Sequence, residues 1–209
     1  MFGDRGNRWH RLLLAWIGSA IVGAWSVALA MPPERVVSLA PNLTQTVLAL
    51  GEGRKLVAVS DYCVLPPGRK DLPRVGGLVN PNLEAIAALR PDRVLLLTAH
   101  EEFLSKFSAL GLPTEVFHYR SLNEIRESIR EVGQVLGVAR RADELVAAIE
   151  KKIAAVRSRV SQLPTRRVLV AVDVPPGAGQ NRSVNIAGNG TLIEEMIRIA
   201  GGVNAYEGG

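Results

Sequence analysis

The chain has very little cysteine and few aromatic residues. Cys63 is the single cysteine, so an internal disulfide is excluded. All three tryptophans lie in the first 30 residues, and aromatic residues make up only 5% of the chain. We expect Cys63 to be a small, partly buried loop residue with no redox or ligating role.

The chain carries only a small excess of positive charge, and catalytic motifs are also scarce. The formal net charge is +5, and 22 basic and 19 acidic residues remain after residue 30. No basic run is interleaved with aromatic residues, which argues against nucleic-acid binding. Residues 60–91, the most informative loop of the chain, contain no nucleophile–base pair, metal-ligand spacing or phosphate loop. Asp61, Asp92, His100 and His118 could supply acid–base groups, but they form no carboxylate pair or triad order, so we expect no enzyme.

The first 30 residues have the composition of a targeting segment. Three arginines precede an almost wholly apolar stretch, residues 12–27, and Ala28-Leu29-Ala30 is a small-x-small cleavage site. The sequence therefore predicts a signal peptide over residues 1–30 and a periplasmic location. An uncleaved inner-membrane anchor is the alternative, because the apolar stretch is nearly long enough to span a bilayer. No cysteine lies near the cleavage site, so a lipoprotein anchor is not supported.

Beyond residue 30, short strands rich in Val and Leu alternate with helices. This alternation is typical of parallel βαβ units, so we expect an α/β fold. Asn82 and Thr191 precede two helices as caps, and Ser121 with Glu124 forms a capping box. The predicted strands are 35–39, 56–59, 93–98, 115–119 and 168–173, and the predicted helices are 44–50, 83–90, 101–110, 121–136, 139–163 and one after Thr191.

The helix predicted over residues 139–163 is the longest. Its apolar residues recur at three- and four-residue steps, and it contains no Gly or Pro before Pro164. Such a helix is on the order of 35 Å long, too long for an ordinary crossover in a small sheet. We interpret it as a spine that joins two lobes. A coiled-coil dimer is the alternative, which the short, alanine-rich apolar stripe disfavours.

These elements predict two Rossmann-like lobes with parallel sheets. The expected division is an N-terminal α/β lobe over residues 34–137, the spine helix over 138–164, and the start of a C-terminal α/β lobe over 165–209. One strand and one helix cannot bury a core, so we expect the second lobe to be truncated and incomplete.

The loop that follows strand 56–59 is the candidate binding wall. It is long and rich in Pro and Gly, and it leaves the end of a strand, where α/β proteins build ligand sites. Tyr62 offers a flat apolar face with a hydroxyl group, and Gly residues let the backbone approach a ligand closely. Asn42, which leaves the first strand at the same edge, could instead only cap a helix. The expected ligand-binding residues are Pro41, Asn42, Tyr62, Gly76, Gly77 and Leu78.

His100 and His118 are further candidates. His100 follows strand 93–98 and could reach a haem iron or another metal, although a lone histidine is more often a solvated loop residue. His118 is expected to lie inside a strand, with a structural role. Residues 173–179 and 185–189 are expected to supply a second wall, with no single residue preferred.

Several stretches together resemble one protein family. These are Arg35–Val59, Ser60-Asp61-Tyr62-Cys63 with Pro66-Pro67, and Val75-Gly76-Gly77 followed by Asn80-Pro81-Asn82-Leu83-Glu84. They resemble the periplasmic solute-binding proteins of cobalamin, haem and iron–siderophore ABC importers, and look most like the cobalamin-binding branch. Residues 187–191 and 200–205 resemble the start of that family's second lobe.

The resemblance implies a monomeric substrate-binding component, without a cofactor, that captures a corrinoid between two lobes and delivers it to a membrane permease. It also implies that Glu84 pairs with an arginine of the permease, whereas the residues alone allow a simple favourable charge in the first helical turn. The family normally continues for several more strands and helices, and its cobalamin binders often line the cleft with tryptophans. Haem or iron–siderophore binding, and a non-functional fragment, therefore stay open.

Overall fold

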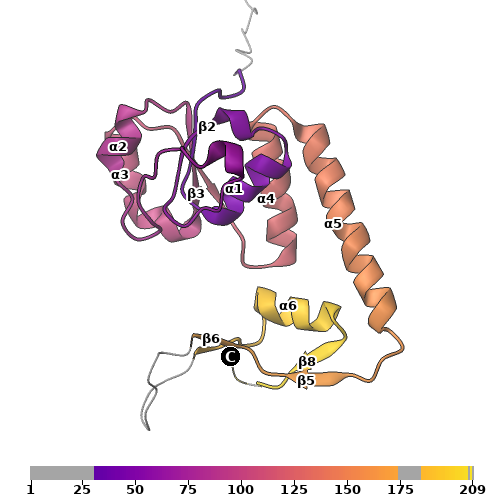
Figure 1. The fold of residues 1–209 in the computed structure, drawn as a ribbon. Helices are drawn as coiled ribbons and strands as arrows, with labels where there is room; N and C mark the ends of the chain where they lie inside the picture. Colours follow the sequence, from indigo (N-terminus) through magenta and orange to yellow (C-terminus); the bar gives the residue numbers. More distant parts are fainter. Residues whose placement is uncertain (1–30, 174–184, 207, 209) are drawn as a thin grey trace, which may run out of the picture. The chain divides into compact units, whose positions relative to one another are not determined.

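The structure is a computed structural model, which describes residues 31–173, 185–206 and 208 (Figure 1). The predicted signal peptide, residues 1–30, and residues 174–179 of the predicted second wall lie outside these residues. The elements are β1 (Val36–Ser38), α1 (Pro41–Ala49), η1 (Gly53–Lys55), β2 (Leu56–Val59), η2 (Pro67–Arg69), α2 (Leu83–Ala88), β3 (Arg93–Leu97), η3 (Thr98–Phe103), α3 (Leu104–Ala109), β4 (Thr114–Phe117), α4 (Leu122–Val135), α5 (Ala139–Val160), β5 (Arg166–Val168), β6 (Ala171–Asp173), β7 (Asn185–Ile186), α6 (Leu192–Ile199) and β8 (Gly202–Asn204).

The first four strands form one parallel sheet in the order β2-β1-β3-β4. In the register of the sheet, Ser38 at the end of β1 lies between Val59 of β2 and Leu95 of β3. Because the strands are parallel, their carboxyl ends meet at one edge. The α/β fold predicted from the strand–helix alternation is therefore confirmed, and the loops after these four strands lie at a common edge.

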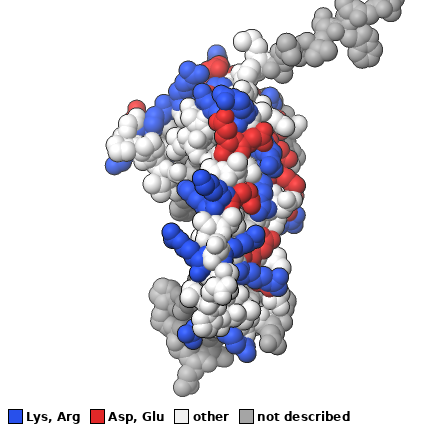
Figure 2. Space-filling model, turned by 90° about the vertical axis from the view of Figure 1, so that its right-hand side faces the viewer, with Lys and Arg blue, Asp and Glu red and all other residues white. Residues whose placement is uncertain are grey.

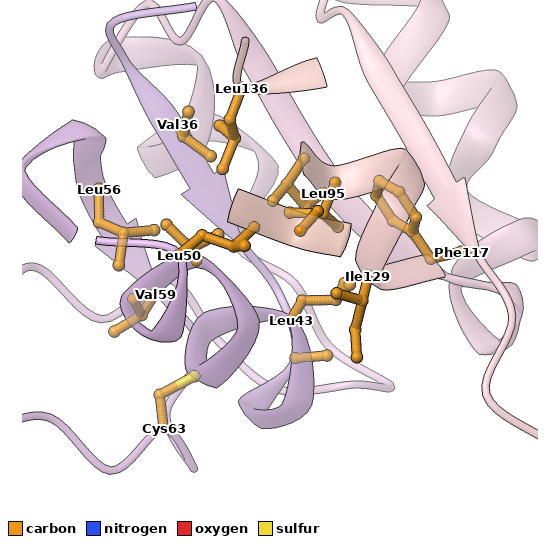
Figure 3. Close-up of a cluster of buried hydrophobic side chains, with 14 of the residues drawn as sticks. Val36, Leu43, Leu50, Leu56, Val59, Cys63, Leu95, Phe117, Ile129 and Leu136 are labelled. Atoms are coloured by element: carbon orange, nitrogen blue, oxygen red, sulfur yellow. The ribbon is translucent and has the colours of Figure 1, made fainter. Parts of the chain in front are cut away.

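Both faces of this sheet are buried, because alternate residues of each strand point to opposite sides. Val36 and Leu95 join a cluster with residues of α1, α4 and α5, which Figure 3 shows in close-up. Val37 and Val94 point the other way, into a cluster with residues of α2 and α3. The near-continuous apolar runs of these strands follow from this two-sided burial. Figure 1 shows the two sets of helices on either side of the strands.

A buried ionic cluster ties the loop after α1 to the start of α5. The Lys55 Nζ donates to the backbone oxygen of Leu136 at 3.1 Å and lies 3.4 Å from Glu52 Oε2. The other oxygen of Glu52, Oε1, accepts from Arg141 Nη1 at 3.0 Å. Lys55 and Glu52 are both buried, so each charge is compensated by a partner instead of water.

The long helix α5 begins at the predicted residue and ends at Val160, three residues earlier than predicted. Its first turns pack closely on α4, because a Cβ on Gly133 would come 2.4 Å from the Cβ of Ala142. Arg130 Nε donates to Asp143 Oδ1 at 3.0 Å across the same pair of helices. None of the helices in the described part of the chain is long and apolar enough to cross a membrane.

The chain after α5 differs from the single strand predicted over residues 168–173. β5 pairs in parallel with β8, whereas β6 pairs antiparallel with β7, so the run is split between two two-stranded sheets. The split lies at Leu169 and Val170, which continue the apolar run and therefore give no sign of it in the sequence. α6 begins after Thr191, whose Oγ1 accepts from the backbone N–H of Glu194 at 3.3 Å as predicted.

Two helix starts also differ from expectation. α1 begins at Pro41, with Ala40 as its N-cap, so Asn42 lies inside the first turn and its role as a cap is wrong. Proline fits this first position because it has no N–H that would need a partner. The helix predicted over residues 101–110 is divided into the 3-10 helix η3 and the short α3.

Candidate functional site

The carboxyl edge of the parallel sheet places two of the predicted segments side by side. β1 and β2 are hydrogen-bonded neighbours, so the start of α1 and the loop after Val59 leave the same edge. Pro41 is exposed there and Asn42 is half-buried, whereas the side chain of Leu43 is fully buried in the core. The first turn of α1 can therefore offer a ligand Pro41 and Asn42.

One arginine holds the loop after β2 in shape. Arg74 Nη1 lies 2.9 Å from the carbonyl oxygen of Ser60, 3.1 Å from that of Asp61 and 2.8 Å from that of Cys63. The backbone around it is also paired, since Val59 N–H donates to the oxygen of Pro73 and Val75 N–H donates to that of Val59. The turn that carries Tyr62 is thus an ordered surface.

Gly76 is required by the geometry of this loop. Gly76 has a φ of +90°, and a Cβ there would come 2.3 Å from the backbone oxygen of Asn80. Its N–H faces Asp61 Oδ1 at 3.2 Å, and the neighbouring Gly77 N–H donates to Asn80 Oδ1 at 3.1 Å. A side chain at position 76 would force the two limbs of the loop apart.

Apolar side chains stand exposed on this loop. Tyr62 is 74% exposed, and its ring lies beside Gly77, where an added Cβ would meet Tyr62 Cε2 at 3.1 Å. Val64 and Val79 are 76% and 75% exposed, and Leu78 is also exposed. Sequence reasoning missed the two valines. One signal in the sequence could have found them: each is an apolar residue in a loop rich in Pro and Gly, where no strand or helix periodicity explains it.

Cys63 is buried, and its thiol lies in a small polar cluster. Its Sγ is 3.1 Å from Thr44 Oγ1 and 3.1 Å from Ser60 Oγ, and Thr44 Oγ1 also donates to Ser38 Oγ at 2.8 Å. This cluster joins the ends of β1 and β2 to α1. Cys63 is therefore more deeply buried than predicted, and its contacts give it a structural role.

His100 is fully buried, which makes the expectation of a solvated loop residue wrong. Its Nδ1 lies 3.1 Å from the N–H of Leu97 and 3.3 Å from the Leu97 oxygen, so the ring closes the turn between β3 and η3. Nε2 is buried without a hydrogen-bond partner in the described structure. Burial lowers the pKa of His100 below its ordinary value of 6.5. In residues 31–173, 185–206 and 208, no three His, Cys, Asp or Glu residues cluster to hold a metal.

The remaining acid–base candidates have separate places in the structure. Asp92 Oδ2 accepts from the N–H groups of Glu34 and Arg35, both at 2.9 Å, so it fixes the chain before β1. His118 lies just after β4, which ends at Phe117, so its predicted place inside a strand is wrong. No two of these groups are brought together by the contacts of the described residues.

Glu84 is exposed in the first turn of α2. The predicted cap is confirmed, because Asn82 Oδ1 accepts from the Ala85 N–H at 2.9 Å. The carboxylate of Glu84 has no hydrogen-bond or ion-pair partner in the described part of the chain. It is therefore free to meet another molecule.

The loop geometry predicts a strong dependence on Gly76. Gly76→Ala should lower the free energy of unfolding by about 1–3 kcal/mol from backbone strain alone. Gly68→Ala is the matched control, since a Cβ there meets nothing within 4 Å, and it should change stability by less than about 0.5 kcal/mol. Urea unfolding of both variants measures this. Equal stability of the two variants would contradict the described loop.

The burial of His100 predicts a pH dependence of stability. Since the pKa is lowered in the folded state, the unfolded chain binds more protons below pH 6.5, and stability should fall as the pH is lowered from about 7.5 to about 5.5. His100→Gln should flatten this slope, whereas His118→Gln, at an exposed position, should keep it. Urea unfolding across this pH range is the measurement. If His100→Gln left the slope unchanged, His100 would not be the group that causes the pH dependence.

Comparisons with known proteins match the chain to one family over most of its length. The family described as periplasmic binding protein matches residues 36–209. The chain is 30% identical over 193 residues to the vitamin B12-binding protein of Vibrio vulnificus strain YJ016, covering 91% of this chain and 68% of that protein.

Solved structures of similar proteins share the fold. The periplasmic haem-binding protein of Roseiflexus sp. RS-1 is 33% identical with a TM-score of 0.72, covering 82% of this chain and 65% of that one. The periplasmic vitamin B12 binding protein of Vibrio cholerae is 26% identical with a TM-score of 0.70, covering 84% and 67%. The chain thus spans about two thirds of the length of these relatives. The resemblance read from the sequence is confirmed: the chain belongs to the periplasmic binding protein family.

Proposed function

We propose that this chain is the substrate-binding component of an ABC importer and that it takes up a large, flat chelate, a corrinoid in the first instance. It captures the ligand against the loop wall after β2 and hands it to the membrane permease. No covalent bond is made or broken in this cycle. The chain therefore needs a surface that is complementary to the ligand, and it needs no acid–base pair. Export through the apolar N-terminal segment to the periplasm is part of the same proposal.

The exposed apolar surface on an ordered loop is the observation that supports the proposal most. Tyr62, Val64 and Val79 each keep about three quarters of their surface exposed, although the loop that carries them is held by hydrogen bonds from Arg74 and from the Gly77 N–H to Asn80. Exposed apolar groups on a fixed loop favour a rigid, flat partner, because little ordering entropy is lost on binding. A corrin or porphyrin ring has that shape, and the names of the relatives in the family include both ligand classes.

Haem is the second candidate, and one feature supports it. The haem-binding relative from Roseiflexus is 33% identical, compared with 30% for the vitamin B12-binding relative from Vibrio vulnificus. Tyr62 could serve either ligand, since its ring can stack on a macrocycle and its phenol oxygen can bind iron. His100 is unsuited to iron in this conformation because it is fully buried.

We place the ligand between this wall and the part of the chain that follows α5. Pro41, Asn42, Tyr62 and the Gly76-Gly77-Leu78 loop would form one side, on the N-terminal lobe proposed over residues 34–137. The segment 185–189 would contribute to the other side, on residues 165–209, with the spine helix proposed over 138–164 between them.

Titration with candidate ligands tests the proposal directly. The full chain should bind cyanocobalamin or haemin with micromolar or better affinity, about −8 kcal/mol. Tyr62→Ala should weaken that affinity by roughly 1 kcal/mol, because the stacking surface is lost. Tyr62→Phe separates the two roles of the residue: a stacked ring keeps its affinity, whereas an iron ligand is lost and the haem absorption band shifts. Calorimetry and absorption spectroscopy are the measurements.

Leu110→Ala is a matched control for Tyr62→Ala, since it removes an exposed apolar side chain from the loop after α3. It should leave the affinity for both ligands unchanged. Binding of neither tetrapyrrole, or equal losses in the two variants, would contradict the proposed wall.

Glu84 is the proposed contact to the permease. Glu84→Gln should leave ligand affinity unchanged and weaken association with the permease about two- to fivefold, in the range of single exposed charge pairs. Glu131→Gln, which neutralises an exposed acid on α4, is the control and should change neither quantity. Association is measured with the permease in nanodiscs. A loss of ligand affinity in Glu84→Gln would contradict the docking role.

A further inference from the structure

The proposed ligand wall comes from two separate segments of the chain. Pro41 and Asn42 belong to the first turn of α1, whereas Tyr62 and Val64 stand exposed on the loop after β2. A flat ligand that lies across both segments needs them in one fixed arrangement, because each segment that must be ordered on binding adds to the entropic cost. The contacts between α1 and this loop therefore decide how well the wall is preorganised.

The side chain of Gln45 crosses from α1 to the loop. Gln45 is exposed and lies four residues after Pro41, so the two residues share one face of the helix. Its Nε2 donates to the backbone oxygen of Val64 at 2.8 Å. The helix is a fixed point for this contact, since Leu43 and Val47 bury it in the core. The hydrogen bond thus joins the two halves of the wall.

A second anchor holds the same stretch of loop from its returning limb. Arg74 Nη1 lies within 2.8–3.1 Å of three carbonyl oxygens over residues 60–63. Gln45 takes the carbonyl oxygen that follows, that of Val64. Tyr62 lies between the two anchors, so its place over the wall depends on both of them.

Apolar packing cannot replace these polar contacts on the outer part of the loop. Tyr62 and Val64 each keep about three quarters of their surface exposed, so few neighbours hold their side chains. Beneath them, Thr44 Oγ1 and Cys63 Sγ lie 3.1 Å apart and also link α1 to the loop. A thiol is a weak hydrogen-bonding group, which leaves the amide of Gln45 as the stronger tie between the two segments.

We propose that Gln45 is a positioning residue of the ligand wall, an inference that rests on the function proposed above. By tying Val64 to α1, it holds the part of the loop that carries Tyr62 in register with the α1 half of the wall. Its effect on binding passes through the loop and requires no contact with the ligand. Loss of the tie should lower ligand affinity about two- to tenfold, the range expected for one hydrogen bond.

A substitution that keeps the length of the side chain and removes the donor tests the proposal in the full chain. Gln45→Met should weaken binding of cyanocobalamin or haemin about two- to tenfold. Gln134→Met removes an exposed amide from α4 and is the matched control. Figure 2, which looks onto α5, shows basic and acidic side chains interleaved over the upper part of that face. Arg130 of α4 and Asp143 of α5 pair there at 3.0 Å.

Because such charge pairs hold the two helices, Gln134→Met frees no loop and should leave affinity unchanged. Equal losses in Gln45→Met and Gln134→Met would overturn the proposal.

A double-mutant cycle separates positioning from direct contact with the ligand. If Gln45 acts through Tyr62, then Gln45→Met should weaken binding less than about twofold once Tyr62→Ala has removed the ring. The same full loss in the Tyr62→Ala background would overturn the positioning role, because it would mean that Gln45 acts on the ligand by another route. Calorimetry on the two single variants and the double variant is the measurement.

Hydrogen exchange without ligand tests the tie independently of the proposed function. The Cys63 N–H donates to the Ser60 oxygen at 3.2 Å, and it should exchange faster in Gln45→Met. Gln45→Lys, which restores a donor, should return the exchange to the wild-type rate. Unchanged exchange in Gln45→Met would overturn the proposal whatever the ligand. If the wild type bound no tetrapyrrole, the proposed function would fall, whereas faster exchange reversed by Gln45→Lys would still support the tie.

Discussion

The guanidinium of Arg74 fixes the surface on which the proposed function depends. It lies within 2.8–3.1 Å of the carbonyl oxygens of Ser60, Asp61 and Cys63, and so it converts a loop of about fifteen residues into a paired structure. Leaving the partly buried carbonyl groups of Ser60 and Cys63 unpaired would be costly. Tyr62 can therefore remain exposed on a rigid base, and Gly76 supplies the one backbone conformation that closes the loop.

Three helix caps and one strand follow from local signals in the sequence. Asn82, Ser121 and Thr191 each accept a backbone hydrogen bond at the start of a helix, as expected from residues that compete for backbone groups three positions away. The strand at residues 56–59 was predicted to the residue. These features depend on neighbours in sequence, so pattern alone was sufficient, and the parallel order followed from the strand–helix alternation.

Features that depend on distant partners were not predictable in the same way. The break between β5 and β6 arises because one run pairs with β8 and the next with β7, a choice set by segments about 15–35 residues further along the chain. His100 was expected in solvent because a lone histidine after a strand is more often a solvated loop residue, yet its ring turns inward to Leu97. Within the candidate site, Tyr62 and the glycines stood out, whereas Val64 and Val79 needed a structure to show their exposure.

The central claim is that a flat chelate lies against the loop after β2. Hydrogen–deuterium exchange of the full chain, with and without saturating cyanocobalamin or haemin, tests it most directly. The account predicts slower exchange of the backbone N–H groups at Tyr62–Val64 and Gly77–Val79 with ligand bound, and unchanged exchange in α3. Protection confined to the groove lined by β5 and α6, with no change in the loop after β2, would contradict it.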